Sequence, residues 1–320
     1  MKIADVKETV KEARKNPGYP PIFLWGSPGI GKSQSVKQVA REEGIELRDV
    51  RASLLDPTDL KGFPYISEGR MCWAPPSFLP TDGEGILFLD ELNLAPQSVM
   101  SACYQLILDR RIGEYQLPEG WYIVAAGNPK GMGVQRMSKA LINRFLHIQV
   151  EVHPEEWQQW AAQNGVHPMI QAFLRMRPQF LMPSDQDTKE GPYPTPRSWE
   201  FVSTTVKATW PKRPKIEVLE GLVGSAAAAE YDQFFTIYES GVFPHDILSG
   251  ASYQLPEEQA VRYILLTACV MQATPEQIGN LLAFVNQLGQ ELQALFEALV
   301  QSRPDLMETK EYVAWLCKQK

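Results

Sequence analysis

Short apolar runs alternate with longer amphipathic segments through the first half of the chain. The runs predicted as strands are residues 22–25, 47–51, 86–90, 122–126 and 145–150. Segments with apolar side chains three and four residues apart, such as residues 4–15 and 33–41, predict helices. Strands that are apolar throughout and separated by helices are typical of a parallel sheet covered on both faces. We therefore expect an α/β fold with a parallel five-stranded sheet.

The strand pattern stops after His153 and only helical patterns follow. Pro154 and the two glutamates after it begin a segment in which Trp157 and Ala161 share one face. Later, Thr274 and Gln277 flank Pro275 in the pattern of a capped helix start. The second half of the chain is therefore expected to be all-helical.

One glycine-rich stretch lies between the first predicted strand and the helix that follows it. Its residues are Gly26, Ser27, Pro28, Gly29, Ile30, Gly31, Lys32 and Ser33. They match G-x-x-x-x-G-K-[ST], the phosphate-binding P-loop. Glycines let the backbone N–H groups face phosphate oxygens, and the helix N-terminus adds partial positive charge. Lys32 is expected to bind the β- and γ-phosphates of ATP and Ser33 to ligate Mg²⁺; the alternative is a chance glycine turn.

Two carboxylates follow the apolar strand at residues 86–90. The strand ends in Asp90 and Glu91 follows directly. Since the carboxyl ends of parallel strands share one edge, both acids are expected beside the P-loop. Asp90 is predicted to hold Mg²⁺ and Glu91 to polarise the attacking water. A strand that merely ends in solvent is the alternative for this pattern taken alone.

Three further residues complete the candidate site. Asn128 follows the strand at residues 122–126 and is expected to contact the γ-phosphate, unless Asn128 and Pro129 only form a turn. Arg144 directly precedes a strand, and Arg197 begins a helix. Each arginine has the alternative of pairing with surface acids.

These five signals, in this order, resemble an AAA+ ATPase, and the wider sequence resembles its MoxR branch. The matching stretches are DPTDLKG at residues 56–62, LDELNLAP at 89–96, AAGNP at 125–129 and ALINRF at 140–145. The resemblance covers about residues 1–235 and implies three roles. Asn128 would be sensor 1, Arg144 an arginine finger offered to a neighbouring subunit, and Arg197 sensor 2, in cis or in trans.

The resemblance also implies an architecture and partners. We expect an AAA+ core at residues 1–152 and a helical lid at 153–238, followed by a helical C-terminal extension at 239–320 that the resemblance does not cover. The resemblance implies a homo-oligomeric ring, usually a hexamer, that remodels a protein client together with a von Willebrand factor A domain protein.

The same branch inserts a hairpin at residues 62–76, whose Phe63, Tyr65 and Trp73 would point toward the pore unless they pack on the core. Residues 198–200 and 221–230 resemble the MoxR proteins related to the Rubisco-activating and gas-vesicle ATPases. Where this family often has an arginine the chain has Leu94, and where it often has an aspartate the chain has Asn143.

Composition narrows the partner class. The net charge is −7 and no run of Lys or Arg stands out, which argues against a nucleic-acid backbone as ligand. The alternative function is that of an AAA+ nucleic-acid motor or loader. A third possibility is a nucleotide-switched scaffold without hydrolysis, but the presence of Asp90, Glu91 and Arg144 argues against it.

No apolar run approaches about 18 residues, so no membrane span is expected. Four scattered cysteines and an N-terminus without an apolar run predict free thiols in the cytoplasm.

Overall fold

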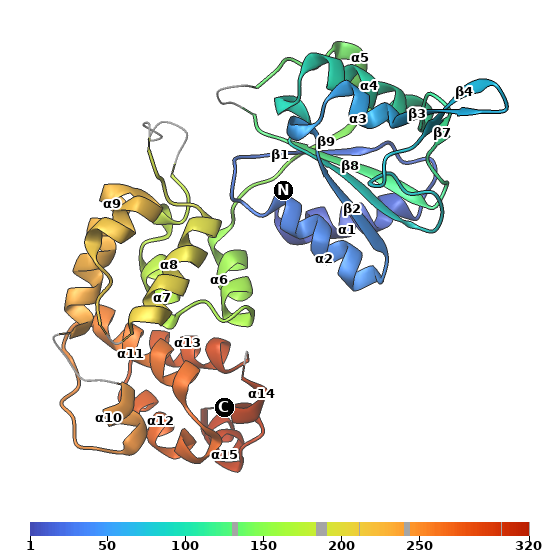
Figure 1. Cartoon of the computed structure of the whole chain (residues 1–320). Coiled ribbons are helices and arrows are strands. Elements are labelled where there is room, and N and C mark those ends of the chain that lie inside the picture. Colours follow the sequence, from blue (N-terminus) through green and yellow to red (C-terminus); the bar gives the residue numbers. More distant parts are fainter. Residues whose placement is uncertain (130–133, 184–190, 211, 240–243, 302, 320) are drawn as a thin grey trace. The chain divides into compact units, whose positions relative to one another are not determined.

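The computed structural model describes residues 1–129, 134–183, 191–210, 212–239, 244–301 and 303–319 (Figure 1). The chain forms two compact units, Met1–His153 and Pro154–Lys320. The first is an α/β core and the second is helical. The finer division of the chain into a core, a lid and an extension stays a prediction.

A five-stranded sheet in the order β2-β5-β8-β1-β9 forms the centre of the first unit. Its strands are β1 (Ile22–Trp25), β2 (Glu46–Arg51), β5 (Gly85–Asp90), β8 (Trp121–Gly127) and β9 (Leu146–Gln149). All neighbouring strands pair in parallel. The predicted parallel α/β fold is confirmed, and the strand ends lie within two residues of those expected from the apolar runs.

Helices cover both faces of this sheet (Figure 1). On one side lie α1 (Ile3–Arg14) and α2 (Lys32–Glu43), which pack against each other. On the other side lie α3 (Pro57–Lys61), α4 (Gln97–Asp109) and α5 (Lys139–Ile142). Alternate strand residues such as Leu87 and Ile123 join the α4 side in one hydrophobic core. Burial on both faces explains why the central strands β1, β5 and β8 are largely apolar, whereas the edge strands β2 and β9 carry exposed polar residues.

A hairpin projects from the α/β unit (Figure 1). Its strands β3 (Phe63–Ser67) and β4 (Arg70–Ala74) pair with each other in antiparallel register. Gly62 precedes the hairpin with φ 84°, and a Cβ there would lie 1.9 Å from the Ala74 carbonyl oxygen. A second short hairpin joins β6 (Arg111–Ile112) and β7 (Tyr115–Gln116).

The register of the projecting hairpin separates its aromatic residues. Tyr65 pairs with Cys72, so Trp73 lies on the face opposite to Tyr65 and Phe63. The three aromatic residues predicted to point toward the pore thus lie on two faces of the hairpin, and their place in a pore stays a prediction. Two large apolar residues of this hairpin, Ile66 and Phe63, have exposed fractions of 82% and 76%.

The second unit packs its helices around aromatic side chains. Its helices are α6 (Pro154–Gln163), α7 (Pro168–Met176), α8 (Pro196–Thr209), α9 (Ile216–Glu239), α10 (Pro244–Ser249), α11 (Gln259–Gln272), α12 (Ile278–Val285), α13 (Gln290–Val300), α14 (Pro304–Met307) and α15 (Lys310–Gln319). Phe173 lies in contact with the rings of Trp199 and Tyr231. Helix α11 packs on α7 and so joins the last part of the chain to this cluster. No described helix has the length and apolar character that crossing a membrane needs.

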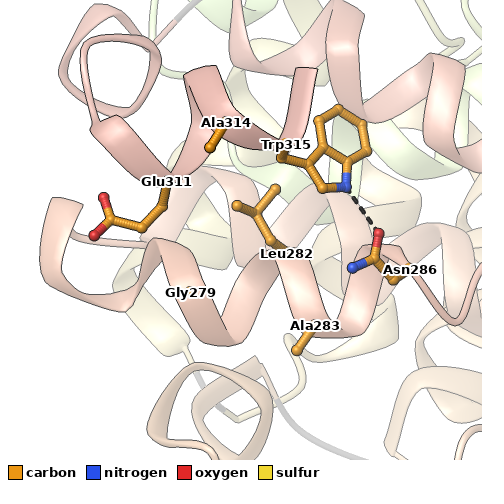
Figure 2. Close-up of a pocket in the computed structure, with 7 residues that line it drawn as sticks. All are labelled: Gly279, Leu282, Ala283, Asn286, Glu311, Ala314 and Trp315. Atoms are coloured by element: carbon orange, nitrogen blue, oxygen red, sulfur yellow. Dashed lines mark hydrogen bonds between the residues drawn. The ribbon is translucent and has the colours of Figure 1, made fainter. Parts of the chain in front are cut away.

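Two local features mark this unit. Helix α9 is broken at Gly224, whose φ of 78° and ψ of 161° are not helical. Figure 2 shows a surface groove between α12 and α15, lined by residues that include Leu282, Glu311 and Trp315. In it the indole Nε1 of Trp315 donates to Asn286 Oδ1 over 2.8 Å.

Candidate functional site

The predicted P-loop joins the end of β1 to the start of α2. Gly29 and Gly31 have φ values of 78° and 101°, which residues with a Cβ rarely adopt. Gly26 is buried, and a Cβ there would lie 2.3 Å from Cδ1 of Ile30. The glycines of the motif therefore serve the tight curl of this loop, and the loop leads directly into the N-terminus of α2.

Lys32 is the first residue of α2, and its side chain folds back over the loop. The residue is only 8% exposed. Its Nζ donates to the carbonyl oxygens of Gly26 and Ser27 over 2.6 and 3.0 Å. It also donates to Oδ1 of Asn128 over 3.2 Å. These oxygens hold the ammonium group at the centre of the loop, where a phosphate would need it.

Ser33 and Asp90 come together from different elements. The Ser33 hydroxyl donates to Asp90 Oδ2 over 2.6 Å, and Asp90 Oδ1 accepts from the backbone N–H of Glu91 over 2.9 Å. A hydroxyl and a carboxylate at hydrogen-bond distance form a pair of hard oxygen donors. Such a pair fits Mg²⁺, which is commonly bound by one or two carboxylates together with water and phosphate oxygens.

Glu91 follows β5 in the left-handed backbone conformation, with φ 56°. Its carboxylate Oε2 accepts a hydrogen bond from the Ser53 hydroxyl over 2.5 Å. Ser53 lies in the short turn η1 (Ala52–Leu54) after β2, and β2 is the neighbour of β5 in the sheet. Ser53 was not predicted from the sequence, because nothing in the linear pattern indicates that β2 and β5 pair.

Asn128 lies directly after β8, and its backbone is held by the side chain of Asn93. Asn93 belongs to the turn η2 (Leu92–Leu94) after Glu91. It was also missed as a site residue; the one available signal is its place in the stretch that follows the two acids.

The structure thus brings the P-loop, Asp90, Glu91 and Asn128 to one edge of the sheet, where the sequence predicted them. The two predicted arginines belong to other elements. Arg144 is exposed between α5 and β9, and no described carboxylate pairs with it. Arg197 is an exposed residue in the first turn of α8, after the N-cap Thr195, and belongs to the helical unit.

Residues 21–145 match the family described as AAA domain (dynein-related subfamily). This range contains the P-loop, both acids, Asn128 and Arg144. It begins just before β1 and ends just before β9.

Among curated proteins, the chain is 35% identical over 157 residues to midasin of Giardia intestinalis. That match covers 45% of this chain and 3% of the relative. It is 33% identical over 152 residues to midasin of Dictyostelium discoideum, covering 42% of this chain and 2% of the relative. The chain therefore spans only a few per cent of the length of these relatives.

Two solved structures are similar over a larger share of the chain. A RuvB mutant from Thermotoga maritima aligns with a TM-score of 0.47 at 17% identity, over 77% of this chain and 75% of that chain. NtrX from Brucella abortus in complex with ADP aligns with a TM-score of 0.45 at 16% identity, over 93% of this chain and 68% of that chain.

Proposed function

Since the α/β unit of this chain is an AAA+ ATPase domain, we propose that the chain hydrolyses ATP in an oligomeric ring to remodel or activate a protein client. The ring would be a hexamer of the MoxR type, acting with a von Willebrand factor A domain protein. The residues named above have separate roles in this proposal.

The observation that carries the proposal is the meeting of two residue pairs at one sheet edge. Lys32 contacts Asn128, and Ser33 contacts Asp90. Lys32 would bind the β- and γ-phosphates, and Asn128 would contact the γ-phosphate and the attacking water. Each pair joins the P-loop to a different strand of the sheet, β8 through Asn128 and β5 through Asp90, so the whole site depends on the parallel sheet.

The carboxylates of Asp90 and Glu91 would have different roles, one toward the metal and one toward the water. Ser33 and Asp90 would hold Mg²⁺, which when bound offsets the negative charge of the phosphate oxygens. Glu91 would polarise the water, and its present hydrogen bond to Ser53 holds the carboxylate until a phosphate and water compete for it.

The arginines supply the reason for an oligomer. A transferring phosphoryl group needs positive charge beyond Lys32 as it reacts. Arg144 is exposed and pairs with no described carboxylate, which fits a residue that is offered to the site of a neighbouring subunit. Arg197 is likewise exposed and is proposed to contact the nucleotide, in cis or in trans.

The projecting hairpin is the proposed client-binding element. Its exposed residues include Phe63, Ile66 and Met71, and its one basic residue is Arg70. An apolar surface with so little positive charge favours a protein client over a phosphate backbone. The four cysteines are free thiols, in keeping with the proposed cytoplasmic setting.

A steady-state ATPase assay with and without Mg²⁺ tests this function. We expect slow Mg²⁺-dependent hydrolysis that a von Willebrand factor A partner stimulates and that single- or double-stranded DNA does not. Replacing Phe63 and Ile66 with Ala should abolish the stimulation and leave basal hydrolysis unchanged. Val313→Ala is the matched control, because Val313 is an exposed apolar residue of the helical unit.

Two outcomes would contradict the proposal. Absence of Mg²⁺-dependent hydrolysis would remove the ATPase assignment. Strong stimulation by DNA at physiological salt, lost in the hairpin variant, would replace the protein client with a nucleic-acid motor or loader.

A further inference from the structure

The side chain of Asn93 binds both backbone groups of one neighbouring residue. Its Nδ2 donates to the Asn128 carbonyl oxygen over 2.7 Å. Its Oδ1 accepts from the Asn128 N–H over 3.1 Å. An amide that donates and accepts in this way imitates the backbone of a paired strand.

This contact continues the sheet beyond the last paired residues. The pairing of β5 with β8 ends at Leu89 and Ala125, three positions before Asn128. Beyond that point β5 gives way to Glu91 and the turn η2, so no strand backbone is left on that side for Asn128. The Asn93 side chain supplies the missing donor and acceptor.

Asn93 is closely packed, and its two hydrogen bonds need both a donor and an acceptor. Asn93 is only 1% exposed. A Cβ at Gly127 would lie 2.4 Å from Asn93 Oδ1, so the amide can approach because position 127 is glycine. An aspartate would lose the donor, and an apolar residue would lose both groups and leave the Asn128 N–H and C=O unpaired.

Asn128 in turn leads into the phosphate-binding loop. Its side-chain Oδ1 accepts from Lys32 Nζ over 3.2 Å. The backbone carbonyl oxygen of Asn93 also accepts from the N–H of Gln135 over 2.7 Å. The turn that follows Glu91 is therefore joined through one buried side chain to the residue that contacts Lys32.

We propose that Asn93 is a positioning residue for ATP hydrolysis, which acts by holding Asn128 in place. This inference rests on the proposed function. In this role Asn93 needs no contact with the nucleotide; it sets where the Asn128 amide lies relative to Lys32 and to Glu91. Loss of Asn93 should therefore lower turnover far more than it lowers nucleotide affinity, since the P-loop itself is unchanged.

A double-mutant cycle between Asn93→Ala and Asn128→Ala tests the proposal, with kcat and KM measured for ATP. We expect each single variant to lower kcat by about 10- to 100-fold, with KM changed less than about 3-fold. The double variant should be no slower than Asn128→Ala alone, because Asn93 has nothing left to position. A purely structural role would instead give losses that multiply.

Two further variants separate positioning from loss of stability. Asn93→Asp keeps the shape and the acceptor but removes the donor, and should lie between wild type and Asn93→Ala in kcat. Tyr122→Phe is the matched control, because it removes another buried hydrogen bond of β8, from the Tyr122 hydroxyl to the Pro20 carbonyl oxygen. Its kcat should equal that of wild type.

The outcomes are distinguishable. If the wild type hydrolyses ATP and Asn93→Ala is fully active, this inference alone is overturned. The same holds if the losses of kcat multiply in the double-mutant cycle. A wild-type chain that does not hydrolyse ATP overturns both the proposed function and this inference.

Discussion

The indole N–H of Trp25 donates to Nδ1 of His147 over 2.8 Å. Since Nδ1 accepts, Nε2 carries the ring proton, and it lies 2.8 Å from the Ile142 carbonyl oxygen, to which it donates. Trp25 is the last residue before the P-loop, and Ile142 ends α5 two residues before Arg144. One imidazole therefore connects the strand that carries the P-loop to the segment that carries the proposed arginine finger.

His147→Phe should lower ATP turnover by about 3- to 10-fold. Phenylalanine keeps the ring contacts with Phe23 and Trp25 but removes both hydrogen bonds. The segment before Arg144 then loses the hydrogen bond that connects Ile142 to the imidazole. Nucleotide affinity should stay within about 2-fold, because Lys32 and the loop glycines are unchanged. Steady-state hydrolysis and fluorescent-nucleotide titration measure the two effects.

The control for this variant is His153→Phe. His153 is a partly exposed histidine of the same unit that lies near Glu151 and makes no ring contact with β1. Its turnover should match wild type. Equal turnover in wild type and His147→Phe would show that the imidazole does not affect Arg144.

The parallel core could be predicted because its central strands β5, β8 and β1 are buried on both faces. That burial leaves an uninterrupted apolar run such as residues 86–89, and the polar residue after the run, here Asp90, marks the carboxyl edge. The contacts of Ser53 and Asn93 could not be predicted, because they depend on which strands are neighbours. The break in α9 was missed as well, since Gly224 looks like any other helical glycine until Pro192 is placed beside it.

Glu91→Gln and Lys32→Ala should fail in different ways. Glutamine at position 91 keeps the size of the side chain but cannot polarise water, so ATP should bind and turnover should fall at least about 100-fold. Alanine at position 32 removes the charge partner of the phosphates, so binding itself should weaken. Nucleotide titration and turnover together separate the variants. Unchanged turnover in Glu91→Gln would refute the role of that carboxylate.

Arg144→Ala should bind ATP and hydrolyse it poorly, because an exposed arginine finger acts on the site of a neighbour. In a mixture of the two variants, Arg144→Ala subunits keep an intact nucleotide pocket, and Lys32→Ala subunits keep Arg144. Mixed rings should therefore regain part of the activity that each variant lacks. Assembly is followed by light scattering with nucleotide. Full activity of a monomer at every concentration would exclude the finger.

The stability of the helical unit should depend on pH through His167. Its Nδ1 accepts from the Met169 N–H at the start of α7. Burial lowers the pKa of this imidazole to about 4, and the charge of Lys207 acts in the same direction. The unfolded chain, with a pKa near 6.5, then binds more protons between these values. The free energy of unfolding of the helical unit therefore keeps its full value above pH 6.5, and it decreases as the pH falls toward 4.

His167→Asn isolates this contribution, because asparagine can accept the same N–H without titrating. Lowering the pH from 7.5 to 5.0 should cost the wild type about 2 kcal/mol more than the variant. Denaturant unfolding at the two pH values measures the difference. His245→Asn, at an exposed histidine of α10, should keep the wild-type pH dependence. Identical pH dependence in wild type and His167→Asn would show that the imidazole is not the titrating group.

Gly224 is the residue at which α9 breaks beside the segment that leads to Arg197. Its φ is 78°, and a Cβ there would lie 2.5 Å from the Pro192 carbonyl oxygen. Gly224→Ala therefore meets both a strained backbone and a clash with main-chain atoms that cannot rotate away. We expect it to destabilise the helical unit by about 2–4 kcal/mol.

Gly221→Ala provides the matched comparison one turn earlier in the same helix. Gly221 is exposed, and nothing lies within 4 Å of the Cβ that alanine would add. Alanine should therefore stabilise α9 by about 0.5–1 kcal/mol. Thermal unfolding should move the two midpoints in opposite directions. Equal shifts of the two midpoints would mean that the break at Gly224 is not needed to accommodate Pro192. The segment carrying Arg197 would then be held in place by other contacts.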